Sequence, residues 1–158
     1  MGYIDMLSNL EIFSDLDKKQ LAKIVAVCKE KEYSRNEIIF LENSPSKEFY
    51  IIVAGKVDIQ LDPDLIRGGK KEHKSHTIVT LKKGDSFGEV ALVDEGLRSA
   101  SAVVASDKCK VLVIGQKDFM DLLHEDIQMG FTVMQNLAAD LCFKIRNTNL
   151  MVREALLV

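Results

Sequence analysis

The sequence has 158 residues, of which 47% are hydrophobic, 21 are basic and 24 are acidic, giving a net charge of −3. This length suits one compact domain with a buried core, and the acidic balance argues against direct binding to nucleic acid or to an anionic membrane surface. The sequence contains neither a signal peptide nor an apolar run of the roughly 18 residues that a membrane span needs, so we expect a cytoplasmic protein.

Three cysteines, Cys28, Cys109 and Cys142, are far apart in the sequence and each has apolar neighbours. A disulfide framework or a metal site would need cysteines paired at short spacing. We therefore expect reduced thiols in the core, no metal site and no cofactor.

The first thirty residues predict helices. Residues 1–10 mix apolar and polar side chains and are long enough for one or two helical turns. Ser14, followed by Asp15 and Asp17, has the character of an N-cap with acidic residues in the first turn. The apolar residues that follow recur at helical spacing, which predicts a helix from about Asp15 to Lys29.

From Glu32 onward, short apolar runs are separated by turn residues, which is typical of a sheet. We expect strands over residues 37–41, 49–53, 57–61, 76–81, 99–104 and 110–114. Seven or eight short strands at this spacing predict a mainly β fold, an eight-stranded β-roll or jelly roll with flanking helices. A single domain over 1–158 would then have N-terminal helices at 1–30, the roll at 31–115 and C-terminal helices at 116–158.

A long polar tip is expected at residues 62–75. Its basic and histidine residues, together with the first residue of the next strand, are Arg67, Lys70, Lys71, His73, Lys74 and His76. Because no aromatic residue is interleaved and the chain is acidic, a solvated hairpin tip is favoured over a nucleic-acid contact. A metal site of the cupin type is a further alternative, but the third histidine, His124, falls in a helical segment, which argues against such a site.

The segment from Gly84 to Ala102 carries the strongest functional signal. Gly88 leaves backbone amides open just before a short apolar run that can form a helical turn, and such amides favour an anion. Arg98 offers a planar fork of donors suited to two phosphate oxygens, and Ser99 adds a hydroxyl donor. Glu89 is acceptor-only when ionised, so it suits a sugar hydroxyl. The set therefore fits a ligand in which a phosphate adjoins a sugar.

A purely structural interpretation of this segment is the alternative. In that interpretation, Gly84 and Asp85 form a hairpin turn, and Glu89 and Arg98 form an ordinary ion pair. It leaves the order of two glycines, a carboxylate, an arginine and small residues without an explanation.

The run Phe87-Gly88-Glu89-Val90-Ala91-Leu92, followed by Arg98-Ser99-Ala100, resembles the phosphate-binding cassette of the cyclic-nucleotide-binding domain family. This family includes bacterial catabolite activators, kinase regulatory subunits and gated channels. The resemblance implies that Glu89 binds the ribose 2′-hydroxyl and that Arg98 binds the cyclic phosphate, with further phosphate contacts from Ser99 and the Gly88 region.

Other ligand-binding residues are expected around the cassette. Val90 and Ala100 belong to its lining, and Ile59 and Leu81, together with Val90, are candidates for an apolar wall against base and sugar. Leu97 stands where many family members have proline; this loosens the turn but removes no ligand-contacting group.

Two helices are expected after Gly115, one over residues 117–123 and a longer one from about Ile127 to the end. The longer one carries a stripe of small and apolar residues spaced by three and four: Met134, Ala138, Leu141, Ile145, Thr148, Val152 and Ala155. This spacing is typical of a helix pair and predicts a homodimer; the alternative is a stripe docked on the chain's own sheet. In bacterial activators the equivalent helix also reaches the adenine, which implies base contacts from Thr148 and Asn149.

These observations predict a sensor without catalytic activity, which binds cAMP or cGMP and then shifts its C-terminal helices. The serine at position 99 of the cassette is more similar to the bacterial activators than to the kinase subunits, and this similarity favours cAMP. The output would pass to an effector protein, or to an effector domain outside this chain; the start at Met1 and the absence of a terminal linker favour a complete protein. The alternative is a degenerate domain of this fold that serves only in dimerisation or interaction.

Overall fold

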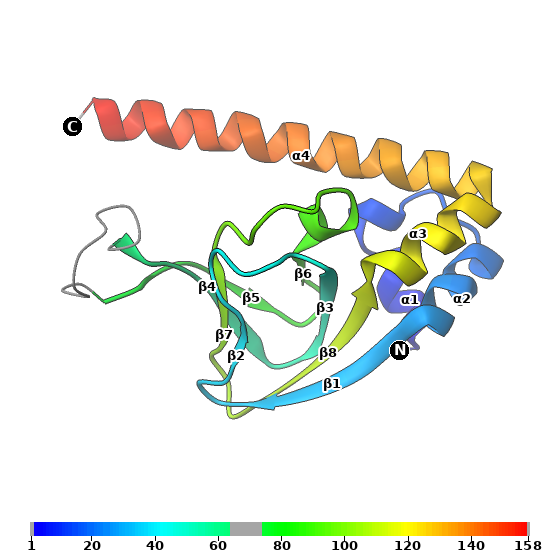
Figure 1. Ribbon diagram of the computed structural model, residues 1–158, viewed down its shortest axis with the longest axis horizontal. Helices are drawn as coiled ribbons and strands as arrows, with labels where there is room; N and C mark the ends of the chain where they lie inside the picture. Colours follow the sequence, from blue (N-terminus) through cyan, green and yellow to red (C-terminus); the bar gives the residue numbers. More distant parts are fainter. Residues whose placement is uncertain (1, 64–73, 158) are drawn as a thin grey trace. The chain divides into compact units, whose positions relative to one another are not determined.

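The structure is a computed structural model that describes residues 2–63 and 74–157. It forms two compact units, one made of Met1–Ala26 with Asp121–Val158 and the other of Val27–Met120 (Figure 1). Most of the basic tip predicted from the sequence, namely Arg67, Lys70, Lys71 and His73, lies outside the described residues.

The unit Val27–Met120 consists of two antiparallel four-stranded sheets. The first has the strand order β1-β8-β3-β6, formed by Cys28–Ser34, Lys108–Gly115, Glu48–Ala54 and Ser86–Phe87. The second has the order β2-β7-β4-β5, formed by Ile38–Phe40, Ser101–Val104, Lys56–Leu61 and His76–Lys82. The predicted eight-stranded β-roll is confirmed, and the strand at Ser86–Phe87 is one that the sequence pattern did not predict.

The core of the roll is filled by side chains from both sheets. Its buried members are Tyr50, Ile52, Val57, Phe87, Ala102, Val104, Cys109, Val111 and Val113. Alternate residues of β7 and β4 supply this core, as the period-2 geometry of a strand requires. Burial of these apolar side chains holds the two sheets together.

The N-terminal helix is shorter than predicted. Asp17 and Gln20 cap it reciprocally, because the Asp17 carboxylate accepts from the Gln20 amide at 2.8 Å and the Gln20 side chain accepts from the Asp17 amide at 3.0 Å. The helix α2 therefore spans Lys18–Val27, and the prediction of Ser14 as its N-cap is wrong. A 3-10 turn, η1, at Glu11–Phe13 precedes it.

The prediction that the sheet begins near Glu32 is also wrong, because β1 begins at Cys28. This strand pairs with β8 residue by residue, from Cys28 opposite Ile114 to Ser34 opposite Lys108. The ladder of backbone hydrogen bonds outweighs the helical spacing that placed residues 28 and 29 in the preceding helix.

The other unit is helical. It contains α1 (Tyr3–Ser8), η1, most of α2, the end of α3 (Gln116–Glu125) and α4 (Ile127–Leu156). Helix α4 has 30 residues and is therefore about 45 Å long. It is tied to the N-terminal segment by the Asn136 amide, which donates to the carbonyls of Ser14 at 2.9 Å and Ile12 at 3.4 Å. Both predicted C-terminal helices are confirmed.

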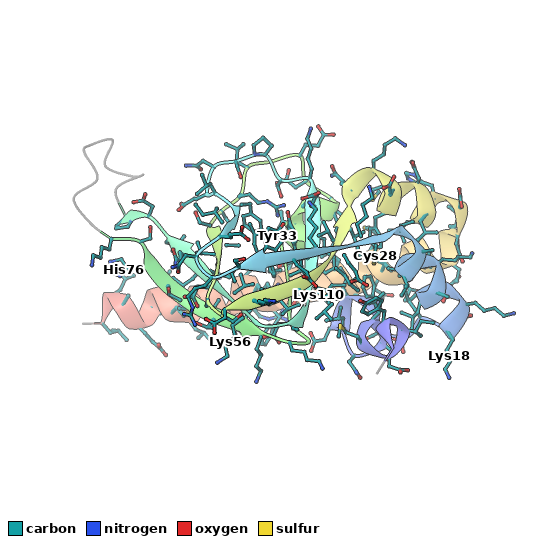
Figure 2. All side chains as sticks on the ribbon, turned by 90° about the horizontal axis from the view of Figure 1, so that it is seen from below. Lys18, Cys28, Tyr33, Lys56, His76 and Lys110 are labelled. Atoms are coloured by element: carbon teal, nitrogen blue, oxygen red, sulfur yellow. The ribbon has the colours of Figure 1, made fainter. Side chains whose placement is uncertain are left out.

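The three cysteines are free thiols in different environments. Cys28, at the start of β1 (Figure 2), is half-buried, and burial raises the pKa of its thiol to about 12. Cys109 lies in the core of the roll, where burial also raises its pKa. Cys142 is exposed on α4, so the prediction of a core thiol is wrong at this position because the second half of α4 has no buried face.

Candidate functional site

The segment predicted to bind a ligand begins with a turn. Gly84 has a φ of 90°, and the Asp85 carboxylate accepts a hydrogen bond from the Lys82 amide at 2.8 Å. The Asp85 amide in turn donates to the Lys82 carbonyl at 2.9 Å. A tight turn is therefore present at Gly84 and Asp85, but it leads from β5 in the second sheet to β6 in the first, so the hairpin interpretation is wrong.

Gly88 starts the predicted helical turn. Its φ of 77° and ψ of 22° place it in the left-handed region, which glycine enters without a steric cost. The turn that follows, η3, spans Glu89–Leu92 and is anchored by the fully buried Ala91 and Leu92. Glu89, in its first turn, is half-buried, while the Val90 side chain is 40% exposed.

Arg98 is buried, with an exposed fraction of only 6%. Its Nη2 donates to the carbonyl oxygen of Glu48 at 2.7 Å, and the guanidinium carbon lies 4.0 Å from the centre of the Phe40 ring. The Arg98 backbone is tied to the loop between β2 and β3. Its amide donates to the Ser44 carbonyl and its carbonyl accepts from the Asn43 amide, both at 2.8 Å. The arginine is therefore held by contacts from strands far away in sequence.

The hydrogen bonding of this arginine is incomplete. The Arg98 Nε atom is buried and has no hydrogen-bond partner among the residues that the structure describes. Burial lowers the pKa of Arg98, whereas Tyr50, Glu48 and Glu89 act in the opposite direction. An arginine stays protonated in a protein, so the site holds a desolvated cation with a buried donor that has no acceptor among the described residues.

Three aromatic rings form the floor beneath the arginine. The Phe40 ring lies 5.6 Å from Tyr50 and 5.9 Å from Phe87, and the rings of Tyr50 and Phe87 are stacked at 5.0 Å. The Tyr50 hydroxyl donates to a carboxylate oxygen of Glu48 at 2.6 Å. That bond and burial, with burial the larger cause, raise the pKa of Tyr50.

Sequence reasoning missed this floor. Phe40, Glu48 and Tyr50 lie in predicted strands, where an aromatic residue is most simply interpreted as core. The contact that matters uses the backbone carbonyl of Glu48, which any residue possesses, so the residue type gave no signal.

A cavity of about 550 Å³ borders Arg98. Its lining residues are Ile38, Ile39, Phe40, Leu41, Ser44, Pro45, Lys47, Glu48, Tyr50 and Arg98. Arg98 is the predicted site residue that this cavity shares with the cassette; Glu89, Val90, Ile59 and Leu81 are not in its lining.

Two of the three candidates for an apolar wall lie on one face of the second sheet, whereas Val90 is in η3. Ile59 and Leu81 are partly buried against the core of the roll. Leu81 is opposite Val57, and Val79 is opposite Ile59, so Val79 lies on the same face as both candidates. Val79 is 45% exposed and extends the apolar surface, although the sequence did not single it out.

The remaining predicted residues fall in two places. Ser99 is exposed and Ala100 is half-buried, directly after Arg98 in the cassette. Thr148 and Asn149 are exposed on α4 in the other unit, and the Thr148 hydroxyl donates to the Lys144 carbonyl at 2.9 Å. Base contact by these two residues stays a prediction.

The other chemical alternatives gain no support. Within residues 2–63 and 74–157, no group of three or more His, Cys, Asp or Glu side chains is placed to hold a metal ion. His76 lies at the start of β5 (Figure 2) and His124 near the end of α3. The described helices include none with the length and apolar character that crossing a membrane would require.

Comparison with known proteins identifies relatives of this chain. The family model described as "Cyclic nucleotide-binding domain" matches residues 30–126. A cGMP-dependent protein kinase of Drosophila melanogaster (isozyme 2 forms cD5/T2) is 34% identical over 122 residues, covering 77% of this chain and 12% of the kinase. A cAMP-dependent protein kinase regulatory subunit of Schizosaccharomyces pombe is 31% identical over 129 residues, covering 82% of this chain and 28% of the subunit.

A solved structure extends the likeness to bacteria. The catabolite activator protein of Thermus thermophilus superposes with a TM-score of 0.76 at 25% identity, covering 92% of this chain and 63% of the activator. The chain thus spans a small part of the two kinase-related proteins and about two thirds of the activator.

Proposed function

The chain belongs to the cyclic nucleotide-binding domain family, and from this premise we propose that it binds cAMP or cGMP reversibly and responds by shifting its C-terminal helices. The observation that carries the proposal is Arg98, a buried cation whose Nε has no hydrogen-bond partner among the described residues. A cyclic phosphodiester carries one negative charge, which one arginine in a water-poor site can balance.

Each cassette residue then has a role in the proposed complex. The Nε of Arg98 donates to a phosphate oxygen, assisted by the Ser99 hydroxyl and by amides of the turn that Gly88 starts. Glu89 accepts a hydrogen bond from the ribose 2′-hydroxyl. Val90 and Ala100 complete the lining, and the apolar face of Ile59 and Leu81, extended by Val79, covers the base and sugar.

The identity of the base belongs to the proposal as well. We favour cAMP because the serine at position 99 makes the cassette similar to that of the bacterial activators. The relatives that match this chain include both a cGMP-dependent and a cAMP-dependent kinase protein. Thr148 and Asn149 are the proposed base contacts. Neither nucleotide binding nor the helix shift requires a chemical reaction, so the proposed activity is binding and regulation without catalysis.

A hydrogen bond next to the arginine supports the proposed helix movement. Arg98 donates to the Glu48 carbonyl, and the adjacent Lys47 carbonyl accepts from the amide of Gln116, the first residue of α3, at 2.9 Å. A ligand that pulls on Arg98 therefore acts on Glu48, the residue next to the carbonyl that fixes the start of α3. A shift of this kind is limited by the ligand's differential affinity for the two arrangements.

We also propose that the protein is a cytoplasmic homodimer that pairs through α4 and passes its signal to an effector protein or to an effector domain outside this chain. Direct nucleic-acid binding by these residues is not part of the proposal. The exposed apolar half of α4 favours a second candidate, a degenerate domain that dimerises without binding nucleotide. In that case a large excess of cAMP or cGMP would leave the unfolding temperature unchanged, whereas ligand at 100 times Kd stabilises a binding protein by about 2.7 kcal/mol.

Calorimetric titration of the wild type and of Arg98→Gln with cAMP and with cGMP tests the proposed function. The substitution leaves a desolvated phosphate without its charge partner, so we expect a loss of about 2 to 5 kcal/mol, which is tens to thousands of fold in affinity. Arg35→Gln is the control, because Arg35 pairs with Asp107 at 2.9 Å on the exposed surface. Equal affinity of the wild type and Arg98→Gln would remove Arg98 from the site.

A further inference from the structure

We propose that Phe40 is the positioning residue for Arg98, holding the guanidinium flat so that its Nε faces the ligand phosphate. This inference rests on the proposed function, since it concerns the same arginine. Phe40 lies in β2, 58 residues before Arg98, and no cassette pattern includes it.

The first constraint on the guanidinium is the aromatic face below it. The guanidinium carbon lies 4.0 Å from the Phe40 ring centre and 5.7 Å from that of Tyr50. The Phe40 ring is itself fixed, because it is packed against the core and contacts the rings of Tyr50 and Phe87. A cation over a fixed aromatic face is attracted to it, and more strongly when water is excluded.

The second constraint acts in the plane of the guanidinium. Nη2 donates to the Glu48 carbonyl at 2.7 Å. The Glu48 side chain is held by the Tyr50 hydroxyl at 2.6 Å and by the Lys31 ammonium at 3.4 Å. The Glu48 carbonyl, which accepts the Arg98 hydrogen bond, therefore belongs to a residue whose side chain is anchored by two neighbours.

Together, the ring and the carbonyl restrict the guanidinium at two points. The ring centre lies 4.0 Å from the guanidinium carbon, the carbonyl accepts from Nη2, and Nε remains without a partner among the described residues. A donor that is already oriented loses little rotamer freedom when an anion arrives. Without the ring, water solvates the exposed face and the side chain samples other rotamers, so affinity falls.

A double-mutant cycle of Phe40→Leu and Arg98→Gln tests the proposal by calorimetry with cAMP and cGMP. We expect Phe40→Leu to weaken both nucleotides by the same factor, about 3- to 30-fold, and to cause no further loss when Arg98 is already glutamine. Phe40→Tyr, which retains an aromatic face, should restore most of the affinity. The core variant Val111→Ala, buried in the same cluster, should lose stability but keep its affinity. An equal loss from Phe40→Leu in both backgrounds would overturn the proposal.

A readout without ligand separates this inference from the proposed function. In the wild type, the ring current of Phe40 should move the Nε–H proton resonance of Arg98 upfield, and Phe40→Leu should remove that displacement while Phe40→Tyr keeps it. If the displacement is present but no nucleotide binds, the positioning role stands and the proposed function fails. If nucleotides bind but Phe40→Leu leaves the Arg98 resonance unchanged, the positioning role is refuted.

Discussion

Arg98 carries a buried donor that is unsatisfied within the described part of the chain, which is a cost to the stability of the free protein. A buried donor without a partner costs about 1 to 3 kcal/mol, and the Nε of Arg98 has none among the described residues. The Glu48 carbonyl and the Phe40 ring offset part of the desolvation of the cation. In the proposed complex, a phosphate that accepts from Nε would remove the remaining penalty.

The approach of Arg98 to Gly88 leads to a prediction at the same scale. A Cβ atom at Gly88 would lie 2.7 Å from Nη1 of Arg98, and the φ of 77° disfavours any side chain. We therefore expect Gly88→Ala to destabilise the fold by about 1 to 2 kcal/mol and to weaken nucleotide binding at least about tenfold, since Arg98 must move by more than its hydrogen bonds tolerate. Urea unfolding and calorimetry measure the two effects.

Gly84→Ala is the matched control for that substitution. Gly84 has a φ of 90°, but nothing lies within 4 Å of a Cβ built there. This variant should pay the same backbone strain while keeping its nucleotide affinity. A similar affinity for Gly88→Ala and Gly84→Ala would show that contact between Gly88 and Arg98 does not matter for binding.

Single residues of the site were predictable from the sequence only where side-chain chemistry carried the signal. A glycine, a carboxylate and an arginine at characteristic spacing predicted the cassette. The Glu48 carbonyl and the Phe40 ring were not predictable, because they join Arg98 across 50 and 58 positions and one of them is a backbone atom. Such contacts depend on strand pairing, which the local pattern does not specify.

At the scale of elements, side-chain caps determine where two of the helices, α2 and α4, begin. The Asp126 carboxylate accepts from the Met129 amide at 3.0 Å and pairs with Lys23 at 3.3 Å, which starts α4. The reciprocal bonds of Asp17 and Gln20 start α2 in the same way. Each cap satisfies an amide that has no partner within its helix.

The cap of α4 predicts a pH dependence of stability. The Met129 hydrogen bond, assisted by Lys23, lowers the pKa of Asp126 below its usual 3.8. Because the folded-state pKa is depressed, Asp126 stabilises the fold above the unfolded value, and this contribution is lost as pH falls through the folded value. We expect the wild type to be more stable than Asp126→Asn at pH 7 and the difference to shrink below pH 3.8, as measured by urea unfolding.

Asp107→Asn serves as the control for the pH series. Asp107 is 91% exposed and pairs with Arg35 across the surface, where an ion pair contributes little. A stability difference between the wild type and Asp126→Asn that does not change with pH would contradict the role assigned to the Asp126 charge.

The sequence predicted most strands but missed those without an apolar pattern. Strands such as β3 and β8 contain long buried runs, which are typical of sheet. Strand β1 carries charged residues, and every residue of it is at least partly exposed, so only its pairing with β8 defines it. Strand β6 has two residues, too few for any periodicity.

At the scale of the whole molecule, the second half of α4 exposes many large apolar side chains. Within the described chain, every residue from Cys142 to Leu157 is exposed, including Ile145 at 61% and Val152 at 52%. Phe143, Leu150 and Met151 are also more than half exposed, so apolar residues extend beyond the predicted seam. An apolar surface of this kind indicates an interaction site.

The proposed dimer is tested by Ile145→Glu. Placing a carboxylate in an apolar helix pair costs desolvation energy without a partner, so we expect the dimer to weaken by at least about tenfold. Sedimentation equilibrium over a range of protein concentrations measures the change. Asn147→Asp is the control, since Asn147 is exposed and outside the seam; a wild type that stays monomeric at every concentration would contradict the proposed homodimer.

In the proposed complex, the Nε of Arg98, which has no partner in the part of the chain that the structure describes, donates to the phosphate of a cyclic nucleotide. The most direct measurement is the ¹H–¹⁵N resonance of Arg98 Nε, assigned by its loss in Arg98→Gln, during titration with cAMP and cGMP. We predict a downfield shift of the Nε–H proton that saturates with the calorimetric affinity, because a charged acceptor forms a short hydrogen bond to a donor that had none. A nucleotide that binds to saturation while this resonance stays in place would contradict the claim.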